Sequence, residues 1–103
     1  DDICYMCIEL KDFNYVGEEI VLYNKCDFKC DLTDWEIKDE GRKTFVFSKF
    51  MLDPSSEVTI KVRNGTNTDK TLFWKGEDYV WTRTGDTLFL RDEEGKLVLW
   101  EGY

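Results

Sequence analysis

The sequence contains no histidine, and Pro54 is its only proline among 103 residues. Without histidine, the Ser-His and Cys-His pairs of hydrolases and every histidine-bearing metal site are excluded. The chain also lacks a Gly-rich phosphate-binding loop. No apolar run approaches the roughly 20 residues of a membrane-spanning helix, and no basic segment followed by an apolar one marks a signal peptide. We therefore expect neither enzyme activity nor membrane insertion.

Basic residues are also scarce, because 14 Lys and Arg face 22 Asp and Glu and leave a formal charge of −8. A chain this acidic is repelled by phosphate backbones and by anionic membrane surfaces. Lys61, Arg63, Lys70 and Lys75 lie close in sequence, but Thr and Asn are interleaved among them. They do not form a basic block, so we predict a protein partner rather than a nucleic acid.

The residues that are present predict an all-β fold. Helical periodicity is nearly absent, β-branched and aromatic residues are frequent, and turn signals recur about every 8 to 12 residues, which is typical of a sandwich or barrel. Residues 57–63 alternate, with Val58, Ile60 and Val62 on one face. Residues 18–24 are apolar on both faces and are predicted to be central in a sheet. We count about eight strands, nearly all with antiparallel neighbours.

The chain length sets one domain, residues 1–103. It opens on Asp1 rather than Met, so we expect a domain excised from a longer exported protein or its mature form. The first strand is predicted at residues 3–10, followed by a polar loop at 11–17. The last two strands, at 86–91 and 96–100, form a hairpin in which Gly95 takes the positive-φ position.

Residues 32–41 (LTDWEIKDEG) are the stretch around which we expect the other strands to pack. A polar turn leads into a short alternating strand with Trp35 and Ile37 on one face. We predict that Trp35 is the core anchor. Trp74 and Trp81 are interpreted as core cover, whereas Trp100 and Tyr103, near the C-terminus, are the better candidates for an interface.

Cys4, Cys7, Cys26 and Cys30 are the candidate disulfide or metal residues. Four thiolates suit a structural zinc site, but in a strand Cys4 and Cys7 would point to opposite faces, and no glycine between them allows a tight turn. Two disulfides are the alternative, and free buried thiols a third. A hairpin around residues 11–17 would bring Cys4 to Cys26 and Cys7 to Cys30, although sequence alone cannot choose among three connectivities. Disulfides would indicate an oxidising compartment.

Two further kinds of site are suggested by short patterns. Asp27, Asp31 and Asp34, and likewise residues 92–94 (DEE), are acidic clusters of the kind that hold Ca²⁺, but neither follows an EF-hand spacing. Their plain interpretation is a solvated surface. Asn64-Gly65-Thr66 fits the N-glycosylation sequon and is predicted to be exposed. It matters only if the chain enters a glycosylating compartment.

From about residue 17 to the end, the chain resembles the lamin tail domain family. The matching segments, in family order, are residues 19–24 (EIVLYN), 31–35 (DLTDW), 39–41 (DEG), 44–47 (TFVF), 65–68 (GTNT), 72–74 (LFW), 80–81 (VW), 85–86 (GD) and 92–95 (DEEG). The family usually has Gly immediately before the Trp, where this chain has Asp34. The four cysteines are a second departure, because they are not general to the family.

This resemblance implies an immunoglobulin-like antiparallel β-sandwich. It also implies a non-catalytic accessory module for protein contacts at a cell surface or in the extracellular space. Two alternatives stay open at this point. One is a structural four-Cys zinc module, and the other is a support domain for an adjacent nuclease or phosphoesterase.

Overall fold

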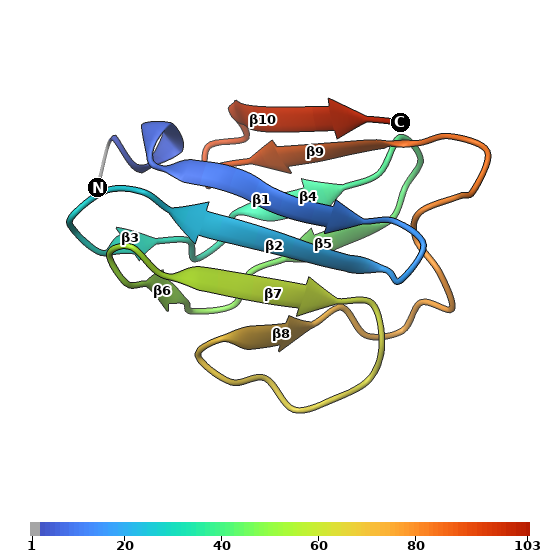
Figure 1. Cartoon of the computed structure of the whole chain (residues 1–103), viewed down its shortest axis with the longest axis horizontal. Helices are drawn as coiled ribbons and strands as arrows, with labels where there is room; N and C mark the ends of the chain where they lie inside the picture. Colours follow the sequence, from blue (N-terminus) through green and yellow to red (C-terminus); the bar gives the residue numbers. More distant parts are fainter. Residues whose placement is uncertain (1–2) are drawn as a thin grey trace.

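A computed structural model describes residues 3–103 as two four-stranded sheets stacked face to face (Figure 1). The front sheet has the order β1 (Ile8–Asn14), β2 (Glu19–Asn24), β7 (Glu57–Lys61), β8 (Thr71–Phe73). The back sheet has the order β10 (Leu97–Gly102), β9 (Thr87–Arg91), β4 (Glu36–Lys38), β5 (Thr44–Val46). The predicted all-β, immunoglobulin-like sandwich is confirmed.

Two elements lie outside these sheets. β3 (Cys30–Asp31) and β6 (Met51–Leu52) form a small ladder, and η1 (Cys4–Met6) is a single 3-10 turn. The two short strands bring the total in residues 3–103 to ten, against the eight we predicted. The one parallel pair in this described range is β7 with β8, in which Ile60 lies beside Leu72.

The core lies between the facing sheets, and the alternating segments supply it. Val58, Ile60 and Val62 are buried, as their spacing predicts, and β2 lies between β1 and β7. Trp35 is 2% exposed and belongs to this buried cluster. Its indole nitrogen has no hydrogen-bond partner among the described residues. The ring therefore stabilises the fold through apolar burial, which for a large aromatic is worth several kcal/mol, on the order of 3.

The predicted first strand, at residues 3–10, is wrong in its position. Residues 4–6 form η1, and β1 continues to Asn14, through the segment predicted as a loop. The Asn14 side chain then accepts a hydrogen bond from the Gly17 amide at 2.8 Å, which closes a tighter turn. The aromatic segment at 79–81 forms no strand, since none lies between β8 and β9 within the described chain. Instead, the Val80 and Trp81 amides donate to the Glu18 carboxylate.

Candidate functional site

The cysteines hold the N-terminal turn against the loop that follows β2. Cys4 is bonded to Cys30 and Cys7 to Cys26, with Cα separations of 5.7 and 5.3 Å. Within η1, the Ile3 carbonyl accepts from the Met6 amide and the Cys4 carbonyl from the Cys7 amide, both at 2.9 Å. Because metal-binding sulfur is thiolate, sulfurs paired in this way do not form the four-thiolate zinc site that we considered.

The pairing inferred from a hairpin, Cys4 with Cys26 and Cys7 with Cys30, is wrong. Since β1 runs further than predicted, Ile8 rather than Cys4 lies opposite Asn24. The Lys25 amide donates to the Cys7 carbonyl at 2.9 Å, which sets Cys7 beside Cys26. The 3-10 turn then carries Cys4 back across the loop to Cys30. Residues 3–8 contain no glycine or proline that would have predicted this turn.

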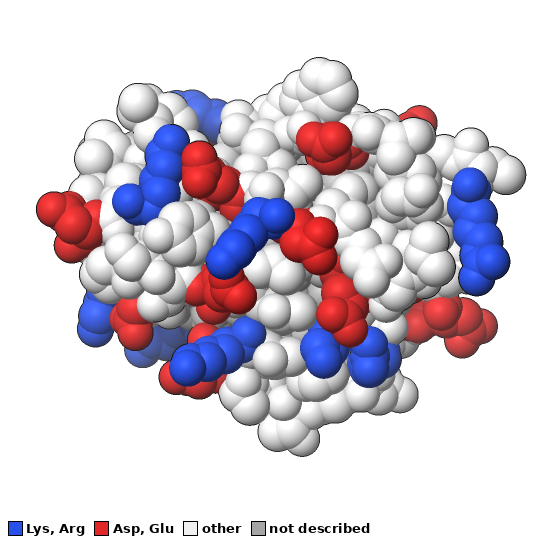
Figure 2. Space-filling view, in the orientation of Figure 1, with Lys and Arg blue, Asp and Glu red and all other residues white. Residues whose placement is uncertain are grey.

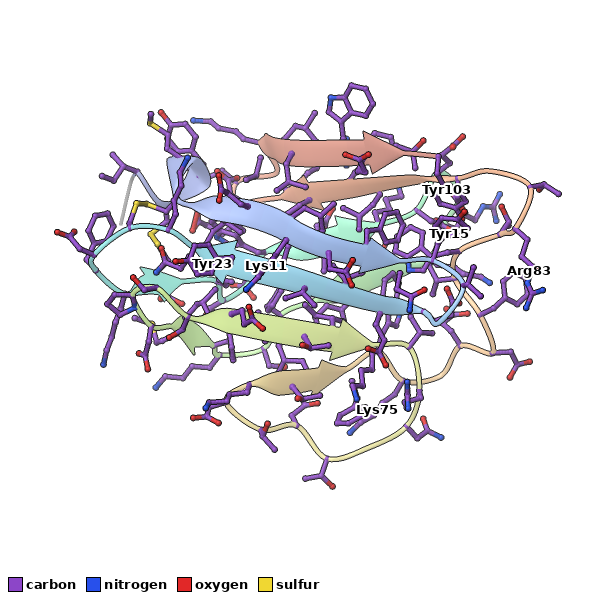
Figure 3. All side chains as sticks on the ribbon, viewed as in Figure 1. Lys11, Tyr15, Tyr23, Lys75, Arg83 and Tyr103 are labelled. Carbon is purple, nitrogen blue, oxygen red and sulfur yellow. A yellow bond between two sulfur atoms is a disulfide. The ribbon has the colours of Figure 1, made fainter. Side chains whose placement is uncertain are left out.

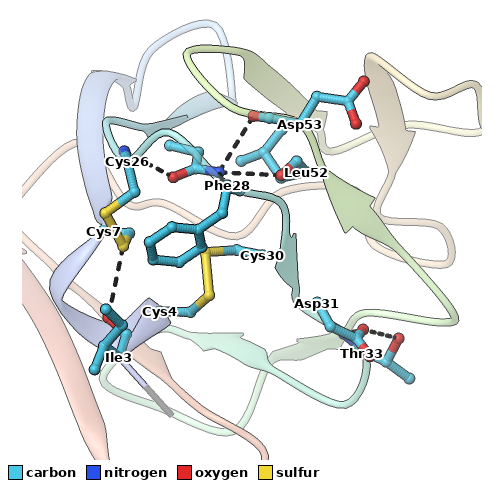
Figure 4. The surroundings of a disulfide bond; sticks show 11 residues. Ile3, Cys4, Cys7, Cys26, Phe28, Cys30, Asp31, Thr33, Leu52 and Asp53 are labelled. Atoms are coloured by element: carbon cyan, nitrogen blue, oxygen red, sulfur yellow. Dashed lines mark hydrogen bonds between the residues drawn. A yellow bond between two sulfur atoms is a disulfide. The ribbon is translucent and has the colours of Figure 1, made fainter. Parts of the chain in front are cut away.

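The cysteine loop, in which Figure 4 labels Cys26, Phe28 and Cys30, is organised from inside by Asn24. Its side-chain amide is fully buried and donates to the carbonyls of Phe28, Leu52 and Asp53 at 2.8, 3.1 and 3.2 Å. Its oxygen accepts from the Cys26 amide at 3.0 Å. Four backbone groups, in the loop, in β6 and in the residue after β6, are therefore satisfied by one side chain. Sequence reasoning missed this role, because Asn at the end of a strand ordinarily indicates only a turn.

Next to η1, the β9–β10 hairpin forms an acidic rim. Asp92 is 9% exposed and accepts from the Glu94 and Lys96 amides, both at 2.9 Å, while Gly95 has φ +82° as predicted. An open pocket of about 770 Å³ lies between this hairpin and η1. It is lined by Tyr5, Trp35, Asp92, Glu93, Glu94, Lys96 and Leu97.

Exposed apolar side chains gather around this pocket and along β10. Tyr5 is 52% exposed, Leu97 48% and Trp100 63%. We call these three residues the β10 surface. Phe89 of the neighbouring strand lies opposite Trp100, and the Arg91 guanidinium lies 5.4 Å from the Phe89 ring. An exposed tryptophan beside other apolar groups and an arginine is the composition of a protein-contact surface.

Of the two predicted interface residues, only Trp100 belongs to this surface. Tyr103 lies at the opposite end of the sandwich, where its ring stacks on Tyr15 at 3.9 Å (Figure 3). Its hydroxyl donates to the Thr82 carbonyl, and burial raises the pKa of the phenol. Trp74 and Trp81 are each 3% exposed and pack in the core. Tyr103 is thus engaged in packing while it stays 38% exposed, and its role at an interface stays a prediction.

The acidic clusters are not arranged to hold a cation. Among residues 3–103, no group of three or more acidic or cysteine side chains is positioned to bind a metal ion. Asp31 accepts hydrogen bonds from the Thr33 hydroxyl and amide, which lower the pKa of its carboxyl. Asn64 is exposed in the loop between β7 and β8, and its glycosylation stays a prediction.

The basic residues that lie close in sequence do not form a positive patch on the front sheet. The Arg63 guanidinium lies 2.9 Å and the Lys61 ammonium 3.9 Å from the same Glu19 carboxylate. Figure 2 shows Lys and Arg interspersed with Asp and Glu over this face. As for membranes, no helix in the described part of the chain is long and apolar enough to span one.

Comparison with known proteins decides the family. The model of the Lamin Tail Domain family matches residues 7–103, nearly the whole chain. The chain belongs to the lamin tail domain family. No curated protein matches it. Members of this family have an immunoglobulin-like, non-catalytic fold, which indicates a protein-interaction module.

The structure explains how this lamin tail domain tolerates Asp34 where the family usually has Gly. Asp34 has φ +68°, in the left-handed region that favours glycine. Aspartate is among the few other residues that adopt this conformation readily. The Asp34 amide donates to the Phe47 carbonyl at 2.9 Å. The turn therefore keeps its shape and delivers Trp35 to the core.

Proposed function

We propose that this lamin tail domain is a non-catalytic protein-contact module of an exported or surface-attached protein, and that it binds through the β10 surface. The exposure of Trp100, 63% on an edge strand, carries the proposal. Tryptophan is the residue most enriched among those that dominate binding energy. Leu97 and Tyr5 extend the apolar area, and Glu93 and Glu94 supply a polar rim.

Three observations support the other parts of this proposal. Both disulfides suit an oxidising compartment such as the extracellular space. The buried Asp92, in the pocket between the β9–β10 hairpin and η1, is held by backbone amides in a structural turn and is therefore not a free acid–base group. The intermixed surface charges and the net charge of −8 disfavour nucleic acid as the partner.

Capture from the fluid or surface fraction of the source cells tests the contact surface. The immobilised 103-residue chain is compared with Trp100→Ala and with the control Val46→Ala. Val46 is an exposed apolar residue too, at 52%, but it lies on β5 at the other edge of the back sheet. We expect at least one protein to be retained by the parent and the control and reduced about tenfold or more by Trp100→Ala. Equal retention on all three chains would reject the β10 surface.

Thiol labelling tests the compartment. Cells are treated with an alkylating reagent before lysis, and the mass of the isolated protein is measured. We expect no labelled cysteine, because all four sulfurs are paired. Four labelled thiols, or zinc that a chelator removes, would contradict both the disulfides and the export.

A further inference from the structure

The four outer strands of the two main sheets differ in how they are protected against pairing with another chain. β5 and β8 have three residues each. β1 has seven, but it carries Glu9, Lys11 and Asp12 and a bulge at Lys11. Short length, charge and bulges are the ordinary ways of protecting a sheet edge. β10 also has a bulge, but it is neither short nor charged over its first four residues.

β10 is six residues long and begins with four consecutive apolar residues, 97–100 (LVLW). Within residues 3–103 it pairs with β9 alone, so its other edge is open. Figure 1 shows it as the outermost strand of the back sheet. A long apolar edge of this kind is a template for adding a strand from another chain.

A bulge determines which side chains of β10 share a face. Leu97 lies opposite Arg91 and Leu99 opposite Leu90, so Val98 is the extra residue. Val98 and Leu99 both pack against the core. Leu97 and Trp100 therefore both lie on the outer face, beside Arg91 and Phe89, although residues three apart in a regular strand point to opposite faces.

This arrangement makes β10 complementary to itself. When two copies pair antiparallel about a twofold axis perpendicular to the sheet, residues opposite each other must share a face. Placing Leu97 opposite Trp100 of the second copy meets this condition because of the bulge. The same register places Val98 opposite Leu99, both facing the core, and Lys96 opposite Glu101. All three kinds of pair are favourable: apolar with apolar on each face, and cation with anion at the ends.

We propose that the occupant of this edge is a second copy of the chain, paired through β10 so that two back sheets become one eight-stranded sheet. The proposal rests on the protein-contact function and deepens it by naming the partner. A strand-to-strand contact flanked by one tryptophan per copy is a small interface, so the dimer is weak and concentration-dependent.

Sedimentation equilibrium of the oxidised chain, at concentrations from about 5 to 500 μM, tests the pairing. We expect the mass to rise from 12.3 kDa toward twice that value. Trp100→Lys should leave a monomer throughout this range. Val46→Lys, on the outer face at the far edge of the same sheet, should dimerise as the parent does. A parent chain that is monomeric at every concentration, or a dimer that survives Trp100→Lys, would overturn the proposal.

Charge exchange tests the register. Lys96→Glu and Glu101→Lys each replace two attractive pairs per dimer by two repulsive ones, so each alone should raise the dissociation constant about tenfold. The double variant should return it to within about threefold of the parent. If the double variant dimerises no better than the single ones, the register is wrong. A thermal melt of each variant confirms folding, which these exposed positions should leave intact.

The failure of self-pairing and the failure of the contact function are distinguishable. A chain that stays monomeric, yet loses a different captured protein on Trp100→Ala, overturns the second-copy proposal alone. A monomeric chain that captures the same proteins with and without Trp100 overturns both.

Discussion

The two ends of this sandwich are closed by different chemistry. At the cysteine end, η1 and the loop after β2 are joined by two disulfides around the fully buried Asn24. At the aromatic end, the β1–β2 turn meets the long loop before β9 through ring packing and hydrogen bonds, with no disulfide. Phe13 lies 4.9 Å from Trp81 and 5.6 Å from Tyr103, and the Glu18 carboxylate binds two amides of that loop.

Because both disulfides lie at one end, the redox state should affect the stability of that end of the domain and not of the other. The cysteine end depends on an oxidant, whereas the aromatic end forms in any compartment. The β10 surface lies beside the cysteine end, since Tyr5 belongs to η1, between the two cysteines of the turn. Reduction should therefore loosen the rim of the contact surface while the far end stays closed.

Removing a disulfide is the strongest test of this difference between the two ends, and it should have the largest effect on stability. Cys4→Ala with Cys30→Ala opens a link between residues 26 apart in sequence. The chain-entropy estimate for such a loop is about 3 kcal/mol of unfolding free energy, and for a domain of this size each kcal/mol shifts Tm by about 4–8 °C. We expect a fall of about 10 °C or more in a thermal melt. Hydrogen exchange should rise at η1 and stay unchanged at residues 80–82, and a uniform rise would contradict two separate ends.

Asn24→Ala tests whether the cysteine end depends on its buried amide as well as on its disulfides. The change leaves the carbonyls of Phe28, Leu52 and Asp53 and the Cys26 amide without their partner. Unsatisfied buried groups cost about 1–3 kcal/mol each before relaxation, so we expect a loss of about 2–3 kcal/mol in denaturant unfolding. Asn14→Ala is the control: it removes a single exposed turn bond and should cost about 0.5 kcal/mol.

Glu18→Ala addresses the aromatic end. The carboxylate accepts from the Val80 and Trp81 amides, the latter at 3.0 Å. Because these amides are partly buried, we expect a loss of about 1–2 kcal/mol. Hydrogen exchange should rise at residues 79–82 and not at the cysteine loop. Glu77→Ala, whose carboxylate only approaches Lys43 at 3.8 Å, should change stability by less than about 0.5 kcal/mol. Equal effects of the two variants would show that the aromatic packing alone holds the loop.

The sequence predicts the features of the fold that depend on local pattern. It does not predict the features that depend on contacts with residues distant in the chain. The alternation of Val58, Ile60 and Val62 and the two apolar faces of β2 correctly predict a core and a central strand. The parallel pairing of β7 with β8 has no local signal, because it depends on which non-local edge is available. Residues 79–81 have strand-forming composition, but a distant carboxylate at Glu18 takes their amides and overrides it.

For the proposed β10 surface, the sequence pointed to Trp100 but not to the residues around it. Trp100 and Tyr103 both lie near the C-terminus, so the sequence proposed both as interface residues and could not distinguish between them. What separates them is the stacking partner Tyr15, which is 88 positions away in number and adjacent in space. The bulge that aligns Leu97 with Trp100 was equally hidden, since one extra residue in a strand leaves no mark on an apolar run.

The smallest expected effect concerns the turn before Trp35. This turn belongs to neither the cysteine end nor the aromatic end. Asp34 has φ +68°, and no side-chain hydrogen bond compensates it among those described in residues 3–103. Asp34→Gly relieves the left-handed strain but gives the unfolded chain more freedom, so the two effects should offset to within about 0.5 kcal/mol. Asp34→Val should instead cost about 1–2 kcal/mol, because a β-branched residue resists positive φ. A destabilising glycine, measured by the same denaturant unfolding, would mean that the aspartate side chain itself fixes the turn.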